Sequence, residues 1–319
     1  MKSDIVRRAG SVNGYATAPA ANGERTSRSR RRRNTPALVW SEARPLVQVI
    51  VQLRYWTAVV LAGSGFGVRP ALGSFCVLLA YCAIYALNGV ADVAEDRRNG
   101  SDRPIASGAI PPRTVAWLAG CLGTAAIAGA AALGWGFLVV TALLLALGWI
   151  YSMPPWPAKA DYRASSAVIF GLGALTYAAG WCTSGRPEVS GRLVAVGVAM
   201  SLWMVFGGMA KDLSDVAGDR EAGRHSWPVA FGEGGSRAVI AVAAVALATL
   251  CTSVSATRFH SLYPVGLVVA AGAVGCGVCA LTPLSRGGRS RARRPYMIFM
   301  LTQYTAHALL LYRAAGLAD

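Results

Sequence analysis

Apolar residues fill nine long stretches of this chain, and the short segments between them carry most of the arginines and prolines. Several stretches approach the roughly 20 residues that a helix needs to cross a bilayer. The block 114–151 is too long for one helix, so we divide it at Gly134-Trp135-Gly136, which predicts a tight hairpin. The pattern predicts nine membrane-spanning helices: 46–66, 71–90, 114–133, 135–151, 165–184, 192–210, 237–256, 262–281 and 296–313.

Lysine and arginine are distributed unevenly over the loops between these segments. Loops after even-numbered spans are rich in them, for example at Arg97, Arg113 and Arg224, whereas the opposite loops carry few. Because cytoplasmic loops of membrane proteins carry an excess of Lys and Arg, the basic side and the N-terminus are predicted to be cytoplasmic. We expect a multi-pass protein of a bacterial cell membrane.

Composition supports an all-α membrane protein rather than a soluble domain. Of 319 residues, 54% are hydrophobic and only 14% are charged. The net charge of +16 follows the loop pattern, which argues against a nucleic-acid partner. Residues 1–40 are rich in Ser, Gly, Ala and Arg and predict a disordered basic cytoplasmic tail, whereas residues 41–319 predict the membrane domain.

Two polar stretches at the ends of apolar segments carry the candidate chemistry. The first has an oxygen ligand at every fourth position, namely Asn88, Asp92 and Asp96. The second has acids at i, i+3 and i+7, namely Asp212, Asp215 and Asp219. On helices, both spacings place the side chains in one stripe. Solvated helix ends would explain single acids, but two aligned stripes beside hydrophobic spans favour a functional site.

The two stretches also belong to an internal repeat. The offset is 123 residues for two pairs of acids and one pair of glycines, and 124 residues for the pairs that follow: Asp92/Asp215, Asp96/Asp219, Gly100/Gly223, Pro104/Pro228 and Gly108/Gly232. Four predicted spans lie between the copies, and an even number brings both to the same membrane face. The sequence therefore predicts two parallel halves, each with one acidic helix end.

Facing carboxylates with an asparagine suit a hard cation such as Mg²⁺, which prefers one or two carboxylates together with waters and phosphate oxygens. Two such helix ends could hold metal ions at a diphosphate. Arginine and lysine on the same side would complete the diphosphate site. The candidate cations are Arg44, Arg103, Lys159, Lys211 and Arg220.

At this point the chain resembles the UbiA-type intramembrane aromatic prenyltransferase superfamily. Asn88-xxx-Asp92-xxx-Asp96 resembles its first Asp-rich motif, and Asp215-xxx-Asp219 resembles its second. The segment 103–108, the Tyr-Ser-Met-Pro-Pro loop at 151–155 with Lys159, and Arg44-Pro45 at the first span are similar to further family motifs. The resemblance covers about residues 40–313.

This resemblance implies helices around a central cavity that is capped by cytoplasmic Asp-rich loops. It implies Mg²⁺-dependent transfer of an isoprenyl group from an isoprenyl diphosphate to a small aromatic or quinone-precursor acceptor. The implied catalytic residues are Asp92, Asp96, Asp215 and Asp219, with Asn88 and Asp212 as further Mg²⁺ ligands. Aromatic side chains would line the path of the allylic cation, and the candidates are Trp149, Tyr151, Trp156, Tyr177, Trp181 and Trp203.

Three positions depart from the family pattern. Gly89 stands where many members carry a second acid, Pro157 stands where an arginine is usual, and Ser226-Trp227-Pro228 replaces the commoner Thr-Leu-Pro. Two other functions share the same pattern of helices. A terpene synthase of the same fold would cyclise the isoprenyl diphosphate without an acceptor. A transporter or scaffold would be expected to carry its acids near the midplane of the membrane rather than only at helix ends.

Overall fold

Helices account for nearly all of the regular structure in the described part of this chain. The computed structural model describes residues 35–98, 100–186 and 188–314. The chain divides into two units, Met1–Thr35 and Pro36–Asp319, and the fold below is that of the second. Its long helices are α3 (Pro45–Leu61), α4 (Val68–Ala91), α6 (Pro112–Leu133), α7 (Trp135–Ser152), α8 (Tyr162–Thr183), α9 (Gly191–Asp212), α11 (Trp227–Thr257), α12 (Tyr263–Leu281) and α14 (Arg294–Ala314).

Shorter helices connect the long ones. They are α2 (Thr35–Glu42), α5 (Val93–Arg98), α10 (Val216–Glu221) and α13 (Arg289–Ala292), with the 3₁₀ turns η1 (Ala158–Ala160), η2 (His260–Leu262) and η3 (Pro283–Ser285). The tail predicted for residues 1–40 lies mostly outside the described residues. Residues 35–40 belong to helix α2, so regular structure begins before the boundary that composition suggested.

Each of the nine predicted spans coincides with a long helix. Seven helices, α4, α6, α7, α8, α9, α11 and α12 (the last together with η2), are long and apolar enough within the described ranges to cross a membrane. Helix α3 has 17 residues, and α14 carries Arg294, Gln303, His307 and Arg313 among its 21. Crossing by these two helices stays a prediction, as does the cytoplasmic orientation.

Local signals in the sequence explain where the helices begin and end. Pro45 and Pro112 occupy the first turns of α3 and α6, where a missing N–H costs nothing. The Asp161 carboxylate caps α8 by accepting from the Arg163 and Ala164 N–H groups at 2.9 and 3.1 Å. Gly134 separates α6 from α7 with φ +122°, which confirms the predicted hairpin.

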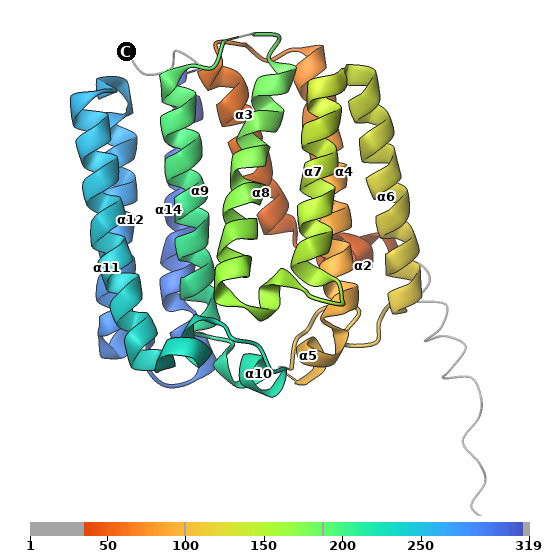
Figure 1. The fold of residues 1–319 in the computed structure, drawn as a ribbon, viewed down its shortest axis with the longest axis vertical. Coiled ribbons are helices and arrows are strands. Elements are labelled where there is room, and N and C mark those ends of the chain that lie inside the picture. Colours follow the sequence, from red (N-terminus) through yellow and green to blue (C-terminus); the bar gives the residue numbers. More distant parts are fainter. Residues whose placement is uncertain (1–34, 99, 187, 315–319) are drawn as a thin grey trace, which may run out of the picture. The chain divides into compact units, whose positions relative to one another are not determined.

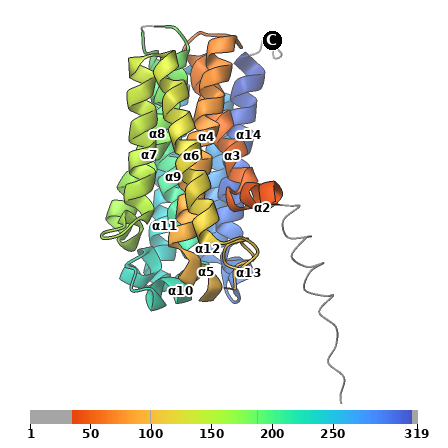
Figure 2. The ribbon, with the colours of Figure 1, turned by 90° about the vertical axis from the view of Figure 1, so that its right-hand side faces the viewer.

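The long helices stand side by side, with α11 and α12 at one edge and α6 at the other (Figure 1). Helix α2 lies crosswise beside α3 (Figure 2). Aromatic stacking joins α9 to α14, since the buried Trp203 ring of α9 lies 5.6 Å from Phe299 of α14. Trp203 also lies 4.9 Å from Phe206 on its own helix. Large apolar side chains such as Val242 and Leu301 are 70% and 69% exposed, which suits contact with lipid tails.

Close packing of α8 on α3 depends on Gly180. A Cβ at this position would overlap the Tyr55 carbonyl oxygen and lie 2.7 Å from the Ala58 Cβ. Because the obstacle is backbone, we expect Gly180→Ala to lower the free energy of unfolding by about 1–3 kcal/mol. Gly120→Ala on α6, where a Cβ meets nothing within 4 Å, is the matched control. Thermal unfolding of the two detergent-solubilised variants measures this difference, and equal midpoints would contradict it.

Candidate active site

The first acidic motif spans the end of one helix and the start of the next. Helix α4 ends at Ala91, and the Asp92 N–H still donates to the Asn88 carbonyl at 2.9 Å. The Asp96 N–H donates to the Asp92 carbonyl at 2.8 Å, so helical spacing continues into α5. The Asn88 side-chain amide donates to Ser152 Oγ at 3.1 Å. Asn88, Asp92 and Asp96 therefore keep their helical spacing of four residues from α4 into α5.

The second motif has the same local geometry. Asp215 precedes α10, and the Asp219 N–H donates to its carbonyl at 3.0 Å. After each motif a left-handed glycine turns the chain, with φ +60° at Gly100 and +68° at Gly223. In the first copy the Ser101 N–H then donates to the Asp96 carbonyl at 2.8 Å. In the second the Arg224 N–H donates to the Asp219 carbonyl at 2.9 Å, again across five residues. The duplication stays a prediction, and these matching turns support it.

Arg224 joins the two motifs. Its guanidinium lies 3.0 Å from Asp92 Oδ1 and 3.5 Å from Asp219 Oδ1, and it also pairs with Glu95. Lys159 pairs with the same Asp92 oxygen. Carboxylates from α5, α10 and the end of α4 therefore converge on one cation, at the end of the bundle where Figure 1 shows α5 and α10.

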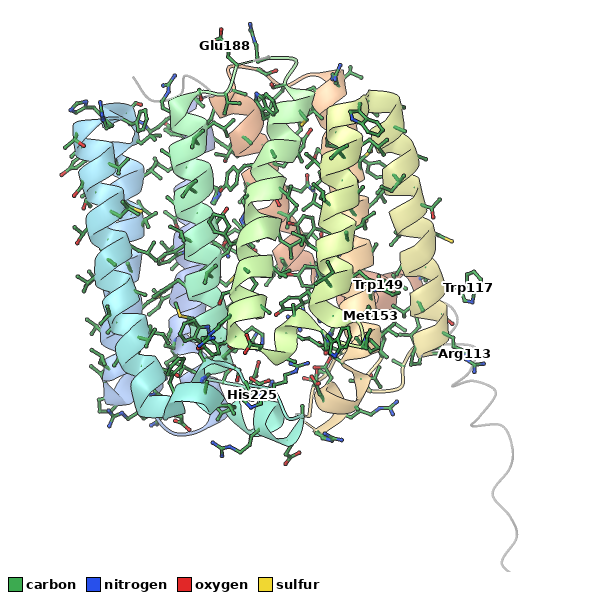
Figure 3. The ribbon with its side chains drawn as sticks, viewed as in Figure 1. Arg113, Trp117, Trp149, Met153, Glu188 and His225 are labelled. Atoms are coloured by element: carbon green, nitrogen blue, oxygen red, sulfur yellow. The ribbon has the colours of Figure 1, made fainter. Side chains whose placement is uncertain are left out.

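A short backbone contact places Lys159 and Arg224 together. The His225 N–H donates to the Ala160 carbonyl at 2.7 Å, and the Tyr162 N–H donates to the His225 carbonyl at 3.0 Å. Figure 3 shows His225 at this end of the bundle and Glu188 at the opposite end. The contact ties the loop before α8 to the loop after α10, so that both cations reach the same Asp92 oxygen.

Opposing effects set the ionisation of the acids. Burial favours neutral Asp92, but Lys159 and Arg224 outweigh it and hold the pKa of Asp92 below its ordinary value. Burial likewise disfavours charge on Asp215, yet Lys211 at 2.8 Å and Arg289 at 3.1 Å lower its pKa to about 2. Burial raises the pKa of Glu95, and the Asp92 charge adds to it against Arg224. Asp92 and Asp215 are therefore anionic at neutral pH.

A cavity of about 210 Å³ begins at Asp92 and Asp212 and continues between the helices. Six predicted site residues line it, and they are Arg44, Asn88, Asp92, Lys159, Lys211 and Asp212. The other five do not line it. Asp96 and Arg103 pair with each other at 2.9 Å, Asp215 pairs with Lys211, Asp219 pairs with Arg224, and Arg220 is exposed on α10.

Comparison with known proteins adds an independent observation. Residues 51–302 match the model of the UbiA prenyltransferase family. This chain belongs to the UbiA family. It is therefore a membrane prenyltransferase, and the predicted family is confirmed.

Two curated relatives are digeranylgeranylglyceryl phosphate synthases. That of Methanopyrus kandleri is 28% identical over 65% of this chain and 74% of its own length, and that of Halobacterium salinarum is 32% identical over 65% and 73%. The fold is similar to a UbiA homolog from Archaeoglobus fulgidus bound to DMAPP and Mg²⁺, with a TM-score of 0.64, 17% identity and coverage of 85% and 99%. The same homolog bound to GPP and Mg²⁺ gives 0.61.

The departure from the UbiA pattern at Gly89 has a structural explanation. Arg103 lies 2.5 Å from the buried Glu42 carboxylate, which also accepts from the Ile105 N–H at 3.1 Å. A Cβ at position 89 would overlap Glu42 Oε1. Glu42 from α2 thus places its carboxylate where many UbiA proteins have an acid in the motif, and Arg103 bridges it to Asp96.

The aromatic lining differs from the prediction. Of the six candidates only Tyr151 lines the cavity, whereas Trp203 packs in the core and Trp156 is 88% exposed. The cavity is lined instead by other aromatic side chains from α4, α11 and α14, namely Tyr81, Tyr85, Trp227, Tyr296 and Phe299. Helix rotation decides which ring faces the cavity, and an apolar run does not reveal that rotation.

Two functional candidates escaped the sequence analysis. Arg224 carries one weak signal, because it directly follows the repeated glycine and Arg103 follows the equivalent glycine by three residues. Glu42 has no such signal in the sequence, because it lies outside both motifs and 46 positions before Asn88. Only tertiary contacts identify these two side chains.

Proposed function

We propose that this chain transfers an isoprenyl group from an isoprenyl diphosphate to an acceptor, in a reaction that depends on Mg²⁺. One observation carries the proposal. Acidic side chains from two separate motifs meet Lys159 and Arg224 at the mouth of a cavity that continues between apolar helices. This arrangement suits a charged diphosphate at the mouth and a hydrocarbon chain within.

The donor set fits Mg²⁺ shared with a diphosphate rather than a metal held by protein alone. No three His, Cys, Asp or Glu side chains in the described part of the chain are placed to hold a metal ion by themselves. Mg²⁺ typically takes one or two carboxylates, with waters and phosphate oxygens completing the shell. When bound, it would neutralise negative charge on the leaving diphosphate. The proposed ligands are Asn88, Asp92, Asp96, Asp212, Asp215 and Asp219.

Cations of the chain would bind the diphosphate directly. Lys159, Lys211 and Arg44 line the cavity, and Arg224 can exchange carboxylate partners for phosphate oxygens. In the reaction the bond from the isoprenyl carbon to oxygen breaks, and its electron pair leaves with the diphosphate. The acceptor forms the new bond to that carbon and releases a proton. Arg103 and Arg220 stay predicted diphosphate ligands, although Arg103 contacts Asp96 and Glu42 here.

The size and lining of the cavity bear on the class of acceptor. We retain the small aromatic or quinone-precursor acceptor, which suits a cavity of about 210 Å³ lined by tyrosines. The relatives named digeranylgeranylglyceryl phosphate synthase suggest a glyceryl phosphate lipid as a second class. A terpene synthase that needs no acceptor is the third.

The proposed setting is a lipid bilayer, with the motifs and the N-terminus on the cytoplasmic side. The arginine-rich loops at 97–113 and 220–224 support this orientation. The predicted bacterial membrane rests on no comparison, since the relatives above are archaeal.

Product analysis tests the function. The purified protein is incubated with dimethylallyl, geranyl, farnesyl or geranylgeranyl diphosphate, with Mg²⁺ or with EDTA. Each reaction is run without an acceptor, with a panel of phenols, or with a glyceryl phosphate lipid. We expect Mg²⁺-dependent diphosphate release and a prenylated phenol by mass spectrometry. A terpene formed without an acceptor would show that the protein cyclises the isoprenyl diphosphate rather than transferring it. A prenylated lipid would show that the acceptor is a glyceryl phosphate lipid rather than an aromatic molecule. No Mg²⁺-dependent release with any donor would refute the proposal.

A further inference from the structure

Between α12 and α14 the chain carries five arginines in nine residues, which we name the arginine segment (residues 286–294). They are Arg286, Arg289, Arg291, Arg293 and Arg294, and all five are exposed. The segment includes α13, which lies at the same end of the bundle as α5 and α10 (Figure 2). None of the proposed Mg²⁺ or diphosphate ligands belongs to it.

Acidic side chains balance the other basic loops but not the arginine segment. The stretches 92–103 and 211–224 contain four acids each, whereas no Asp or Glu occurs from residue 234 to residue 318. Among the described residues, the ion pairs include one arginine of the segment, Arg289, which lies 3.1 Å from Asp215 Oδ1. The other four arginines therefore form a positive surface that suits an anionic partner.

Exposed apolar side chains lie directly beside these guanidiniums. Arg294 donates to the Leu284 carbonyl at 2.9 Å, and Arg286 donates to the Leu281 carbonyl at 3.4 Å. Met297 follows Arg294 by three residues, so it lies on the same face of α14. The two leucines and the methionine are each at least half exposed. Cationic and apolar groups thus meet on one surface, at the end of a helix, α12, that is apolar enough to cross a membrane.

Contacts at both ends hold the arginine segment in place. The buried Arg237 guanidinium of α11 donates to the Ala280 carbonyl at 2.8 Å and to the Ser285 carbonyl at 3.1 Å, which fixes the start of the segment. Near its end, the Arg293 guanidinium lies over the Tyr296 ring, 5.8 Å from the centroid. Because the turn is already formed, binding of a ligand to it would cost little conformational entropy.

We propose that the arginine segment binds the headgroup of an anionic phospholipid. The guanidiniums would donate to its phosphate oxygens, and Leu281, Leu284 and Met297 would contact its acyl chains. A lipid suits both parts of this surface, whereas a soluble polyanion such as a nucleic acid would leave the apolar side chains in water. The bound phosphate would also reduce the repulsion among five neighbouring cations. Lipid binding does not depend on the proposed function, so its test measures binding and not turnover.

Lipid binding to the full detergent-solubilised chain tests this surface. Dioleoyl phosphatidylglycerol and dioleoyl phosphatidylcholine have the same acyl chains but differ in net charge, and both are titrated. Native mass spectrometry counts the lipids retained, and the shift of the unfolding temperature measures the affinity. We expect the wild type to bind phosphatidylglycerol at least about tenfold more tightly, the scale of two arginines near anionic lipid. High salt should reduce this preference, because exposed charges are screened.

Paired substitutions assign the effect to the arginine segment. Arg291→Gln with Arg293→Gln should remove most of the preference for phosphatidylglycerol, whereas Arg291→Lys with Arg293→Lys should retain it, because the charge is kept. Arg98→Gln with Arg113→Gln removes two exposed arginines from other loops and is the matched control. Arg289 is left unchanged because it contacts the second acidic motif. The unfolding temperature without lipid should stay close to that of the wild type, since the substituted side chains are exposed.

The arginine run at residues 30–33 is a second basic stretch of this chain, so it is replaced by glutamine in a separate variant. This variant should keep the preference for phosphatidylglycerol. Equal binding of the two lipids by the wild type would overturn the proposal. A preference that survives Arg291→Gln with Arg293→Gln, or one that is lost only in the control or in the 30–33 variant, would overturn it as well. Displacement of phosphatidylglycerol by equimolar inorganic phosphate or by a single-stranded oligonucleotide would refute a lipid as the partner.

Discussion

Asp92→Ala and Asp215→Ala are each expected to reduce Mg²⁺-dependent diphosphate release by about a thousandfold or more, the scale of losing a principal electrostatic stabiliser. Both carboxylates are anionic at neutral pH, since neighbouring cations lower their pKa. Asp92 lines the cavity, and Asp215 lies beside Lys211, which lines it as well. Without either carboxylate, one half of the site would lose a proposed metal ligand, and its cations would lose a partner.

The two variants are still expected to insert into membranes and to purify like the wild type. Their positions follow the spans, so the apolar helices that drive insertion are unchanged. Glu221→Ala on α10 is the matched control, because this acid is exposed and outside the cavity lining. The assay is release of diphosphate from an isoprenyl diphosphate with and without Mg²⁺. Wild-type turnover in either aspartate variant would refute the assignment of the site.

The second large effect is expected when the acid at position 42 is removed and an acid is introduced at position 89. Glu42→Ala removes the buried partner of Arg103 and should lower the free energy of unfolding by about 3 kcal/mol, as for other broken buried ion pairs. Gly89→Asp alone should also be damaging, because its side chain would overlap Glu42 and place two carboxylates together. The combined variant should regain stability and diphosphate release, since the new carboxylate at position 89 would then occupy the vacated space beside Arg103.

A double-mutant cycle measures this coupling through the unfolding free energy and through the rate of diphosphate release. Glu188→Ala, an exposed acid at the opposite end of the bundle, controls for loss of a charge (Figure 3). Additive effects of the two substitutions would show that Glu42 does not stand in for a motif acid. Recovery of both quantities in the combined variant would support it.

Sequence patterns located the helices well, because the causes are local. Apolar length and Gly134 located nine helices, although α11 begins at Trp227, ten residues before the predicted span 237–256. Asn88, Asp92 and Asp96 also keep their spacing of four residues beyond the end of α4. The hydrogen bond from the Asp96 N–H to the Asp92 carbonyl continues the helical geometry into α5. The match at 51–302 confirms the family that these motifs indicated.

The sequence by itself thus determined the helical membrane fold, the family and the two acidic motifs, all of which depend on spacing along the chain. Tertiary structure alone decided which cations serve those acids and which rings line the cavity. Arg224 reaches Asp92 across 132 positions, and Arg103 reaches Glu42 across 61. Such contacts depend on how helices rotate and pack against one another. That rotation is a property of the whole bundle, so a linear pattern predicts the acidic stripe but not its partners.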